Sequence, residues 1–555
     1  MDDVGAVNAG AAEEIRRLRR YAVCLALLGL TLFVWRLGSH DLWPPDEPRF
    51  GLVAREMRSG GDFSVLSLHD ELYTEKPPLF FWTINAFAWL RGGEIDEWAA
   101  RLPSAVSTLA ALLLILQLGA WLYDARTGFL AALVFMTCLQ IAIRARWASI
   151  DMMLNMFVLA AIVLLWRGCL RTTGPTARWS IRLAWIMMGL GTLAKGPVAL
   201  VLPLLAVLPS LLIARDAAAV RRLFGPTGPL FYLAVTLSWF ALFARRIGLE
   251  SAIGILNRQT VERYADAWHQ QHPLWFYLWR FPAGFIPWIL FLPPAIRLAW
   301  REGTGNPERR RATLFLCTWI AAIALFFSFA TGKRGVYIIP LYPAAALIVG
   351  RLLARAIGKD DPEAAPERAA VLWPFAGWAG ITAVLLVVLP VAALRRHPSL
   401  MVPGIAMAIV LCGGAFGGLL KLRRTRAAAA LAWLTGSLVV TLLLCVGMVL
   451  PLENRYKNIR GFAEQVRPHL EAGAAFGATE TRRDAWVFYT GRFAEMLDSP
   501  ASVIDYLARD GPGYLLIDGA TLERVRGLLP GGVSEVMRGS VEDETYYLLR
   551  RGVGP

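Results

Sequence analysis

Long apolar runs separated by short charged loops occupy most of the chain, from Tyr21 to Leu450. A helix that crosses a bilayer needs about 20 mainly apolar residues. The pattern therefore predicts a polytopic α-helical membrane protein with about 13 transmembrane helices. The expected spans are 21–37, 103–122, 128–147, 152–167, 181–194, 196–214, 229–245, 281–299, 312–330, 336–355, 371–394, 402–420 and 427–450.

The pattern changes after about Leu452. Charged residues then alternate with short apolar runs at 474–477, 514–517 and 546–549, and amphipathic stretches such as 458–470 and 502–509 lie between them. This alternation predicts a small α/β domain. The expected organisation is an N-terminal segment at 1–20, a transmembrane domain at 21–451 with a large first loop at 38–102, and a C-terminal domain at 452–555.

The arginines at 16–20 directly precede the first apolar run, which places the N-terminus in the cytoplasm. Counting spans from there puts the first loop and the C-terminal domain on the periplasmic side. The loops expected inside are mostly rich in arginine, and only 123–126 is weak. The arginine-rich ones are 167–182, 215–222, 297–311, 351–368 and 421–426. We find no cleavable signal peptide, so the first run is expected to be an anchor.

The composition is that of a membrane protein, and the distribution of charge argues against nucleic acid as a partner. Hydrophobic residues make up 56% of the chain, and the mean hydropathy is +0.48. The net charge of +15 does not indicate nucleic acid binding, because Lys and Arg lie in short loops between apolar runs. The six cysteines are scattered in or beside apolar segments without metal-ligand spacing. We therefore expect them to serve as small buried side chains.

Ionisable residues gather on the face of the membrane that is expected to be periplasmic. Charge beside a bilayer is costly and usually serves a substrate path or a reaction. The residues are Asp46, Glu75, Lys76, Asp151, Lys195, Arg263 and Lys333. Span counting placed them together without reference to their chemistry, which makes this face the candidate site.

Asp46 and Glu47 lie among prolines at 44, 45 and 48, which predicts a stiff, non-helical backbone. A rigid carboxylate there suits a general base, a metal ligand or an electrostatic partner of a sugar cation. The alternative is an acidic, solvated loop. Asp151 has the alternative role of N-cap for a helix from Met152 onward, and Lys195 that of a lysine extending to the membrane surface.

His269 and His272 lie close together, but no third ligand at metal spacing is nearby. The chain also has no convincing Walker, Rossmann or Asp-x-Asp nucleotide-sugar motif. An enzyme that faces outward has no nucleotide supply. It would draw an activated group from a lipid carrier, whose phosphate needs Lys and Arg.

Five segments form an ordered set: WPPDEPR at 43–49, EKP at 75–77, GLGTLAKG at 189–196, ERY at 262–264 and KRGVYIIP at 333–340. The set resembles the bacterial aminoarabinose transferases of lipid A, within the protein O-mannosyltransferase-like enzymes that use polyprenyl-phosphate sugars. The resemblance covers about Leu30 to Pro343. It implies a GT-C type glycosyltransferase fold in the bacterial inner membrane. Pro48 and Phe50 replace the usual Thr and Tyr of the first motif, so the sugar and acceptor are less defined than the fold.

The resemblance also implies a role for each polar residue of these segments. The implied catalytic residues are Asp46 and Asp151. The implied ligands of the donor phosphate are Lys76, Arg263, Tyr337 and Arg49. The same cavity would contain Glu47, Tyr73, Glu75, Lys195 and Lys333. Glu75 is the candidate ligand if a divalent metal ion takes part, and no other cofactor is implied.

The leading hypothesis is an inverting glycosyltransferase that moves aminoarabinose from undecaprenyl phosphate to a lipid A phosphate at the periplasmic face, as a monomer. The alternatives are another sugar, or a hydroxyl acceptor on a glycan or protein. A hydroxyl acceptor would require Asp46 to take its proton, whereas a phosphate acceptor needs no base. A flippase for lipid-linked sugars is the rival class. Transporters usually show repeated halves and midplane charges, and this sequence shows neither.

Overall fold

Helices form most of the computed structural model, which describes residues 2–551 apart from 260–271, 359–364, 397 and 480–481. The chain divides into two compact units, here called the helical unit and the mixed unit. The helical unit comprises Met1–Trp35, Thr74–Thr83 and Arg101–Cys445. The mixed unit comprises Arg36–Tyr73, Ile84–Ala100 and Val446–Pro555. The first loop is therefore grouped mainly with the C-terminal domain.

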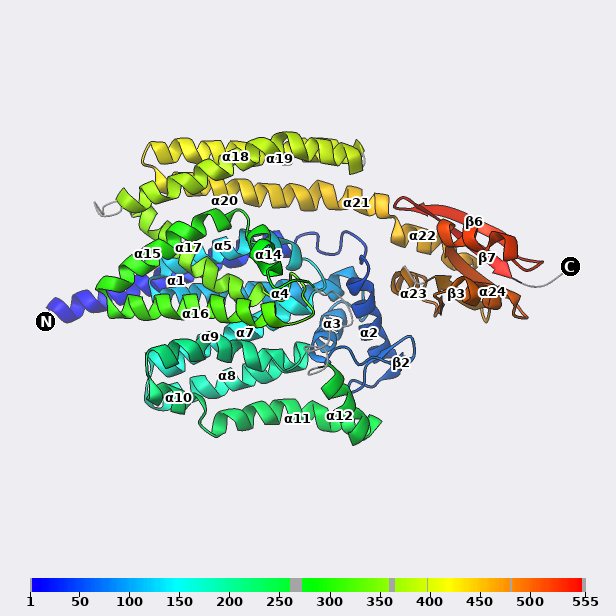
Figure 1. Ribbon diagram of the computed structural model, residues 1–555, viewed down its shortest axis with the longest axis horizontal. Helices are drawn as coiled ribbons and strands as arrows, with labels where there is room; N and C mark the ends of the chain where they lie inside the picture. The colour runs from blue at the N-terminus through cyan, green and yellow to red at the C-terminus, as the bar shows by residue number, and fades with distance from the viewer. Residues whose placement is uncertain (1, 260–271, 359–364, 397, 480–481, 552–555) are drawn as a thin grey trace. The chain divides into compact units, whose positions relative to one another are not determined.

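The helical unit is built from apolar helices joined by short turns (Figure 1). Its α-helices are α1 (Asp2–Phe33), α4 (Glu97–Leu122), α5 (Ala125–Thr137), α6 (Leu139–Arg144), α7 (Ile150–Trp166), α8 (Gly174–Lys195), α9 (Val198–Ile213), α10 (Ala217–Leu223), α11 (Thr227–Ile247), α12 (Leu249–Asn257), α14 (Phe276–Gly284), α15 (Leu292–Gly305), α16 (Pro307–Phe329), α17 (Tyr342–Ile357), α18 (Ala365–Arg396), α19 (Met401–Arg423) and α20 (Ala427–Leu444). Two helices are shared between the units: α3 (Leu79–Trp89) begins in the helical unit and ends in the mixed unit, and α4 has its first residues, 97–100, in the mixed unit.

Each of the expected spans falls on helical structure, and the predicted fold class is confirmed. Among the described residues, eight helices are long and apolar enough to cross a membrane, or up to nine if one bent pair is a single span. That pair carries the expected span 281–299 and bends by 105° between α14 and the segment from Trp288. The expected span 128–147 is likewise divided between α5 and α6, at Cys138. Other expected spans, such as α9, are apolar but shorter.

Small residues allow α5 to pack closely in the centre of the helical unit. A Cβ added to Gly119 of α4 would lie 2.3 Å from the Cα of Gly128 on α5. A Cβ added to Gly350 of α17 would lie 2.7 Å from the backbone nitrogen of Ala131, also on α5. Small residues at helix crossings are the usual way in which membrane helices approach each other. Neither glycine can therefore be enlarged without moving a helix.

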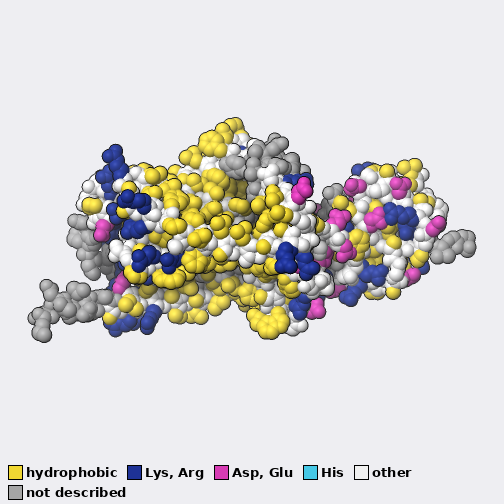
Figure 2. All heavy atoms as spheres, turned by 90° about the horizontal axis from the view of Figure 1, so that it is seen from below, with side chains coloured by type: hydrophobic (Ala, Val, Ile, Leu, Met, Phe, Trp, Pro, Cys, Tyr) yellow, Lys and Arg dark blue, Asp and Glu magenta, His cyan; other side chains and the backbone are white. Residues whose placement is uncertain are grey.

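The outward surface of the helical unit is apolar, as expected for helices that face lipid. On α11, Leu230 is 63% exposed, and Leu237 and Leu242 are also exposed. On α18, Val384 and Val387 are exposed in the same way. Figure 2 shows apolar side chains covering much of this unit, with Lys and Arg gathered toward its ends. A surface of this kind needs a bilayer around it.

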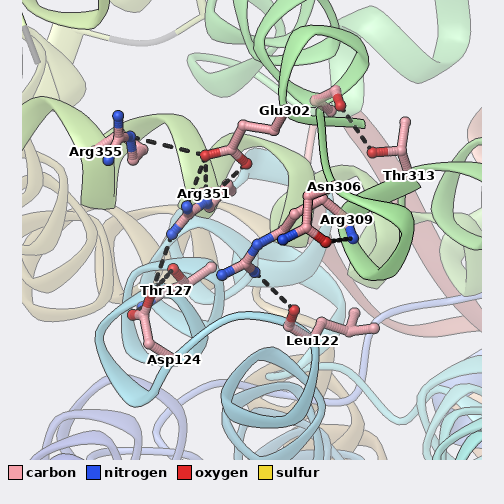
Figure 3. A network of polar contacts seen from close by, with 10 residues as sticks. Leu122, Asp124, Thr127, Glu302, Asn306, Arg309, Thr313, Arg351 and Arg355 are labelled. Carbon is pink, nitrogen blue, oxygen red and sulfur yellow. Dashed lines mark hydrogen bonds and ion pairs between the residues drawn. The ribbon is translucent and has the colours of Figure 1, made fainter. Parts of the chain in front are cut away.

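Three segments that were expected to lie inside the cytoplasm are joined by polar contacts in the helical unit (Figure 3). Arg351 donates from Nη2 to Glu302 Oε1 at 2.6 Å and from Nη1 to Asp124 Oδ2 at 3.1 Å. Arg309 donates from Nη1 to the carbonyl oxygen of Leu122 at 2.9 Å. A cavity of about 300 Å³ opens beside this network. The ion pairs bring together Asp124, Glu302 and Arg351, one residue from each of three segments that were expected on the same side, which agrees with the span count.

The C-terminal part of the mixed unit is an α/β domain, as expected. Its five strands are ordered β4-β3-β5-β7-β6, with β3 parallel to β4 and β5, and β7 antiparallel to β5 and β6. The strands are β3 (Ala475–Thr479), β4 (Glu495–Leu497), β5 (Gly513–Asp518), β6 (Ser534–Val541) and β7 (Glu544–Arg551). The helices are α21 (Leu450–Lys457), α22 (Ile459–Val466), α23 (Arg483–Thr490), α24 (Pro500–Ala508) and α25 (Gly519–Val525). The three apolar runs expected from the sequence, at 474–477, 514–517 and 546–549, coincide with β3, β5 and β7, respectively.

The core of this domain lies between the sheet and its helices. Leu515 and Ile517 of β5 are fully buried against Val503 and Tyr506 of α24 and Val525 of α25. Strand β5 is buried along nearly its whole length, which fits its central place between a parallel and an antiparallel neighbour. The domain can therefore provide a firm support for the segments that pack on it.

Candidate active site

Three residues from distant parts of the chain meet in the helical unit. Asp151 lies in the first turn of α7, and Lys195 is the last residue of α8. The Lys195 ammonium forms an ion pair with the Asp151 carboxylate. The same ammonium lies 4.7 Å from the ring centroid of Tyr337, within the range of a cation–π contact. A carboxylate, an ammonium and a phenol thus form one cluster, and all three were candidates from the sequence.

The expectation that Asp151 caps a helix is wrong. Helix α7 begins at Ile150, so the N-cap position belongs to Ser149, and Asp151 is already inside the first turn. Its carboxylate is turned to Lys195 instead of to the backbone of its own helix. An acidic side chain in a first turn still interacts favourably with the helix dipole. Its main interaction is with the cation of Lys195, 44 positions later.

Lys333 is buried, and its ammonium is bound to backbone carbonyl oxygens. It is 4% exposed, and its ammonium donates to the carbonyl oxygens of Ala330 at 2.6 Å and His272 at 2.8 Å. The following residues are held by α14, because the Tyr277 hydroxyl donates to the carbonyl oxygen of Arg334 at 3.2 Å. These bonds fix the loop that leads into Tyr337. Lys333 therefore supports the position of Tyr337 through the backbone.

Glu75 and Lys76 lie just before α3. The Lys76 ammonium is 3.1 Å from the carbonyl oxygen of Glu75 and 3.8 Å from its carboxylate. The Lys76 side chain is 16% exposed and that of Glu75 is 46% exposed. Among the described residues no group of three or more His, Cys, Asp and Glu side chains is placed to hold a metal ion. Glu75 is therefore not part of such a group within the described part of the chain.

In the mixed unit, Asp46 is the first residue of α2 (Asp46–Gly60). The expectation of a non-helical backbone from Asp46 to Pro48 is therefore wrong. Proline is accepted in the first turn of a helix, where its missing N–H would have no helical partner. Asp46 is partly exposed there, and a carboxylate is favoured at a helix N-terminus. Only the residues before it, 43–45, are non-helical.

The neighbours of Asp46 have different environments. Glu47 is fully buried, and its Oε2 accepts a hydrogen bond from the backbone N–H of Trp43 at 3.1 Å. It thereby fixes the entry to α2. Arg49 lies one turn after Asp46 and donates from Nε to Asp484 Oδ2 at 3.0 Å. Tyr73 is 7% exposed, and its backbone N–H donates to the carbonyl oxygen of Leu66 at 2.8 Å.

Sequence reasoning missed Asp484 and His69. Asp484 Oδ1 is 2.7 Å from His69 Nε2, so one carboxylate engages both His69 and Arg49. Asp484 is more than 400 positions from either partner, and its own surroundings, RRDAW, form no motif. No local signal could have found it. Arg263 and His269, which were both considered from the sequence, lie outside the described residues.

The comparisons with known proteins agree on one class. Residues 75–244 match the family model described as dolichyl-phosphate-mannose-protein mannosyltransferase. The fold is that of a crystal structure of ArnT from Cupriavidus metallidurans bound to undecaprenyl phosphate. That structure has a TM-score of 0.80 and 21% identity, over 95% of this chain and 97% of the other. The structural likeness shows a multi-span membrane fold, and the family model adds a resemblance to sugar transferases over residues 75–244.

Two relatives narrow the class. The undecaprenyl phosphate-α-4-amino-4-deoxy-L-arabinose arabinosyl transferase of Erwinia tasmaniensis is 30% identical over 68% of this chain and 67% of its own. The protein of the same name from Enterobacter sp. is 29% identical over 82% of this chain and 80% of its own. This chain belongs to that family of arabinosyl transferases.

Proposed function

We propose that this protein transfers 4-amino-4-deoxy-L-arabinose from undecaprenyl phosphate to a phosphate of lipid A. The observation that carries this proposal is the match over two thirds of both chains to a transferase named for that donor. The reaction takes place at the periplasmic face of the inner membrane, with the N-terminus in the cytoplasm and the enzyme acting as a monomer. Lipid A as acceptor is consistent with the family, and its phosphate is a ready nucleophile.

In the proposed reaction, an oxygen of the acceptor phosphate attacks C1 of the sugar from the face opposite the carrier. The bond between C1 and the carrier oxygen breaks, and its electron pair stays on the undecaprenyl phosphate. The configuration at C1 is therefore inverted. Because the acceptor is already ionised, no general base is required. Cations at the leaving phosphate lower the barrier by stabilising the charge that develops there.

We assign Lys76, Arg49, Arg263 and Tyr337 to the carrier phosphate. The Asp151–Lys195 pair supports this assignment for Tyr337, because the Lys195 ammonium lies against the ring and limits where the phenol can turn. Asp151 neutralises Lys195 and holds it in place. In this arrangement Asp151 acts through Lys195 and Tyr337. Its role is therefore to position these side chains and not to react with the substrate.

Asp46 is assigned to the positive charge of the donor sugar, which a cation could not stabilise. Positive charge develops on the sugar ring as the bond at C1 breaks, and the donor sugar also carries an amino group. A carboxylate that is partly exposed at the start of α2 can stabilise such charge and orient the amino sugar. Its partial exposure suits this role better than that of Glu47, which is buried and engaged with Trp43.

The test is a transfer assay with purified protein in nanodiscs, undecaprenyl-phosphate aminoarabinose and lipid A. We expect the release of undecaprenyl phosphate and the gain of one pentosamine by lipid A in equal amounts, measured by mass spectrometry. A flippase would leave the donor intact, and a transferase for another sugar would consume only a different donor. The Asp46→Asn protein serves as the inactive control. Intact donor with the wild-type protein would refute the proposal.

A further inference from the structure

One carboxylate of the C-terminal domain joins two separate segments of the first loop. Asp484, in the first turn of α23, has its Oδ2 3.0 Å from Arg49 Nε and its Oδ1 2.7 Å from His69 Nε2. The side chains of Asp484 and His69 are 18% and 7% exposed. Both oxygens of the carboxylate are therefore engaged within a largely buried setting, and all the residues belong to the mixed unit.

The contact between α2 and α23 extends beyond this carboxylate. The Arg55 guanidinium donates to the carbonyl oxygen of Phe488 at 2.7 Å and lies 4.1 Å from the centroid of the Phe488 ring. A Cβ added to Gly51 would lie 2.7 Å from the same ring. Helix α2 therefore lies on α23 with no space between them, and its orientation is set by the C-terminal domain.

The hairpin that carries His69 is also tied to α2. His69 and Asp70 form the turn between β1 (Ser67–Leu68) and β2 (Glu71–Leu72), with φ values of 59° and 61°. Two positive φ values are typical of the tight turns that join short antiparallel strands. The backbone N–H of His69 donates to Glu56 Oε1 on α2 at 2.7 Å. His69 is thus fixed by its backbone to α2 and by its ring to α23.

Electrostatics favour the ionised form of Asp484. Burial opposes its ionisation, but the hydrogen bond from His69 and the charge and hydrogen bond of Arg49 outweigh this effect. Together they hold the pKa of Asp484 below its usual value. The carboxylate is therefore a permanent acceptor near neutral pH. It can hold the Arg49 guanidinium in one orientation.

We infer that Asp484 is a positioning residue for donor binding, which it performs by fixing Arg49 on α2. Arg49 and Asp46 are three positions apart in the same helix, so they lie on one face of α2. A guanidinium is planar, and a bond to Nε therefore sets the direction of its two terminal nitrogens. This inference rests on the proposed role of Arg49 at the donor phosphate. It gives the C-terminal domain a part in the reaction that the transmembrane sequence does not reveal.

The first test compares Asp484→Asn with wild type in the transfer assay. Asparagine keeps the shape but lacks the charge that orients Arg49. We expect the KM for the donor to rise about tenfold, as for the loss of one charge-assisted hydrogen bond, and kcat to change less than about twofold. Binding of undecaprenyl phosphate to the protein in nanodiscs should weaken by a similar factor. An unchanged KM and unchanged carrier binding would overturn the inference.

A double-mutant cycle separates positioning from general support of the fold. If Asp484 acts through Arg49, Asp484→Asn should cause almost no further loss in an Arg49→Ala protein. If Asp484 only supports the domain, the two losses should multiply. His69→Gln keeps a donor to the same carboxylate and should retain most of the donor affinity. A multiplied loss would overturn the inference even if each single variant is impaired.

The matched control is Glu495→Gln in the same domain. Glu495 accepts two hydrogen bonds from Arg509, each at 2.7 Å, and both side chains of this pair are exposed. Its loss should leave KM and kcat unchanged. The failure of the proposed function is recognised separately, because the wild-type protein would then not use the aminoarabinose donor. If only the inference fails, the wild-type protein is active. Asp484→Asn then either leaves the KM for the donor unchanged or adds its full loss to that of Arg49→Ala.

Discussion

Breaking the ion pair between Asp151 and Lys195 should cost stability and activity by separable routes. The two side chains are only 18% and 16% exposed. Removing one partner of a buried pair destabilises a protein by about 3–5 kcal/mol, mainly because the other charge is left uncompensated. Water reaches this pair in part, so we expect Asp151→Asn to lower the free energy of unfolding by about 2–3 kcal/mol. Transfer should fall as well.

The double variant Asp151→Asn with Lys195→Met distinguishes the two effects. It removes the uncompensated ammonium and replaces it with an apolar side chain of similar length. Replacing a buried pair in this way is often nearly neutral. We expect stability within about 1 kcal/mol of wild type. Activity should stay low, because the cation that lies against the Tyr337 ring is gone.

Both quantities can be measured on the same preparations. Unfolding in mixed micelles, followed by tryptophan fluorescence, gives the stability change, and release of undecaprenyl phosphate gives the activity. Glu13→Gln is the control, because it breaks the exposed pair of Glu13 with Arg17 in α1 and should leave the stability nearly unchanged. If the double variant regains full activity with its stability, Lys195 has no role at Tyr337. If it is as unstable as Asp151→Asn, the reasoning about an uncompensated charge is wrong.

Four further results are expected. Asp46→Asn should fold normally, since an asparagine is also accepted at a helix start, but its kcat should fall at least about 100-fold; turnover at the wild-type rate would disprove its assigned role. Lys76→Ala should weaken carrier binding by about 1.5–3 kcal/mol with little change in thermal unfolding, and unaltered binding in nanodiscs would place the phosphate elsewhere. Because the pKa of Asp484 is lowered in the fold, its stabilising contribution is present above the ordinary carboxyl pKa of about 3.9 and disappears as the pH falls through the lowered value; Asp484→Asn should therefore flatten the acid side of a stability–pH curve, and an identical slope would contradict this. A phosphatase that is active only in the periplasm should be active when fused after residue 555 and inactive when fused after Lys421, and equal activity of the two fusions would mean that the span count is wrong.

The helical unit could be predicted because its rules are local. A run of apolar residues must form a helix in lipid, since every backbone N–H and C=O needs a partner within the segment. Arginines then mark one side of the membrane. This is why Asp124, Glu302 and Arg351, which are far apart in sequence, were expected on one side and are found in direct ion pairs.

The site could be predicted only in part, because its residues act through distant partners. Asp151 and Lys195 were expected on the same face, and they form an ion pair. The prolines around Asp46 suggested a stiff loop, but the chain uses Pro48 in the first turn of a helix. A proline signals a helix start or a loop equally well, and only the packing of α2 on α23 decides between them.

The two carboxylates Asp151 and Asp484 illustrate one principle in two separate units. Each forms an ion pair with a cation, Lys195 in one case and Arg49 in the other. An anionic donor needs cations at its phosphate, but cations placed together repel each other and move. A buried carboxylate behind each cation neutralises this repulsion and restricts the side chain before the donor arrives. On the proposed roles of Arg49 and Lys195, the cost of ordering is met during folding instead of during binding, and a residue of the C-terminal domain holds an arginine of the first loop for this purpose.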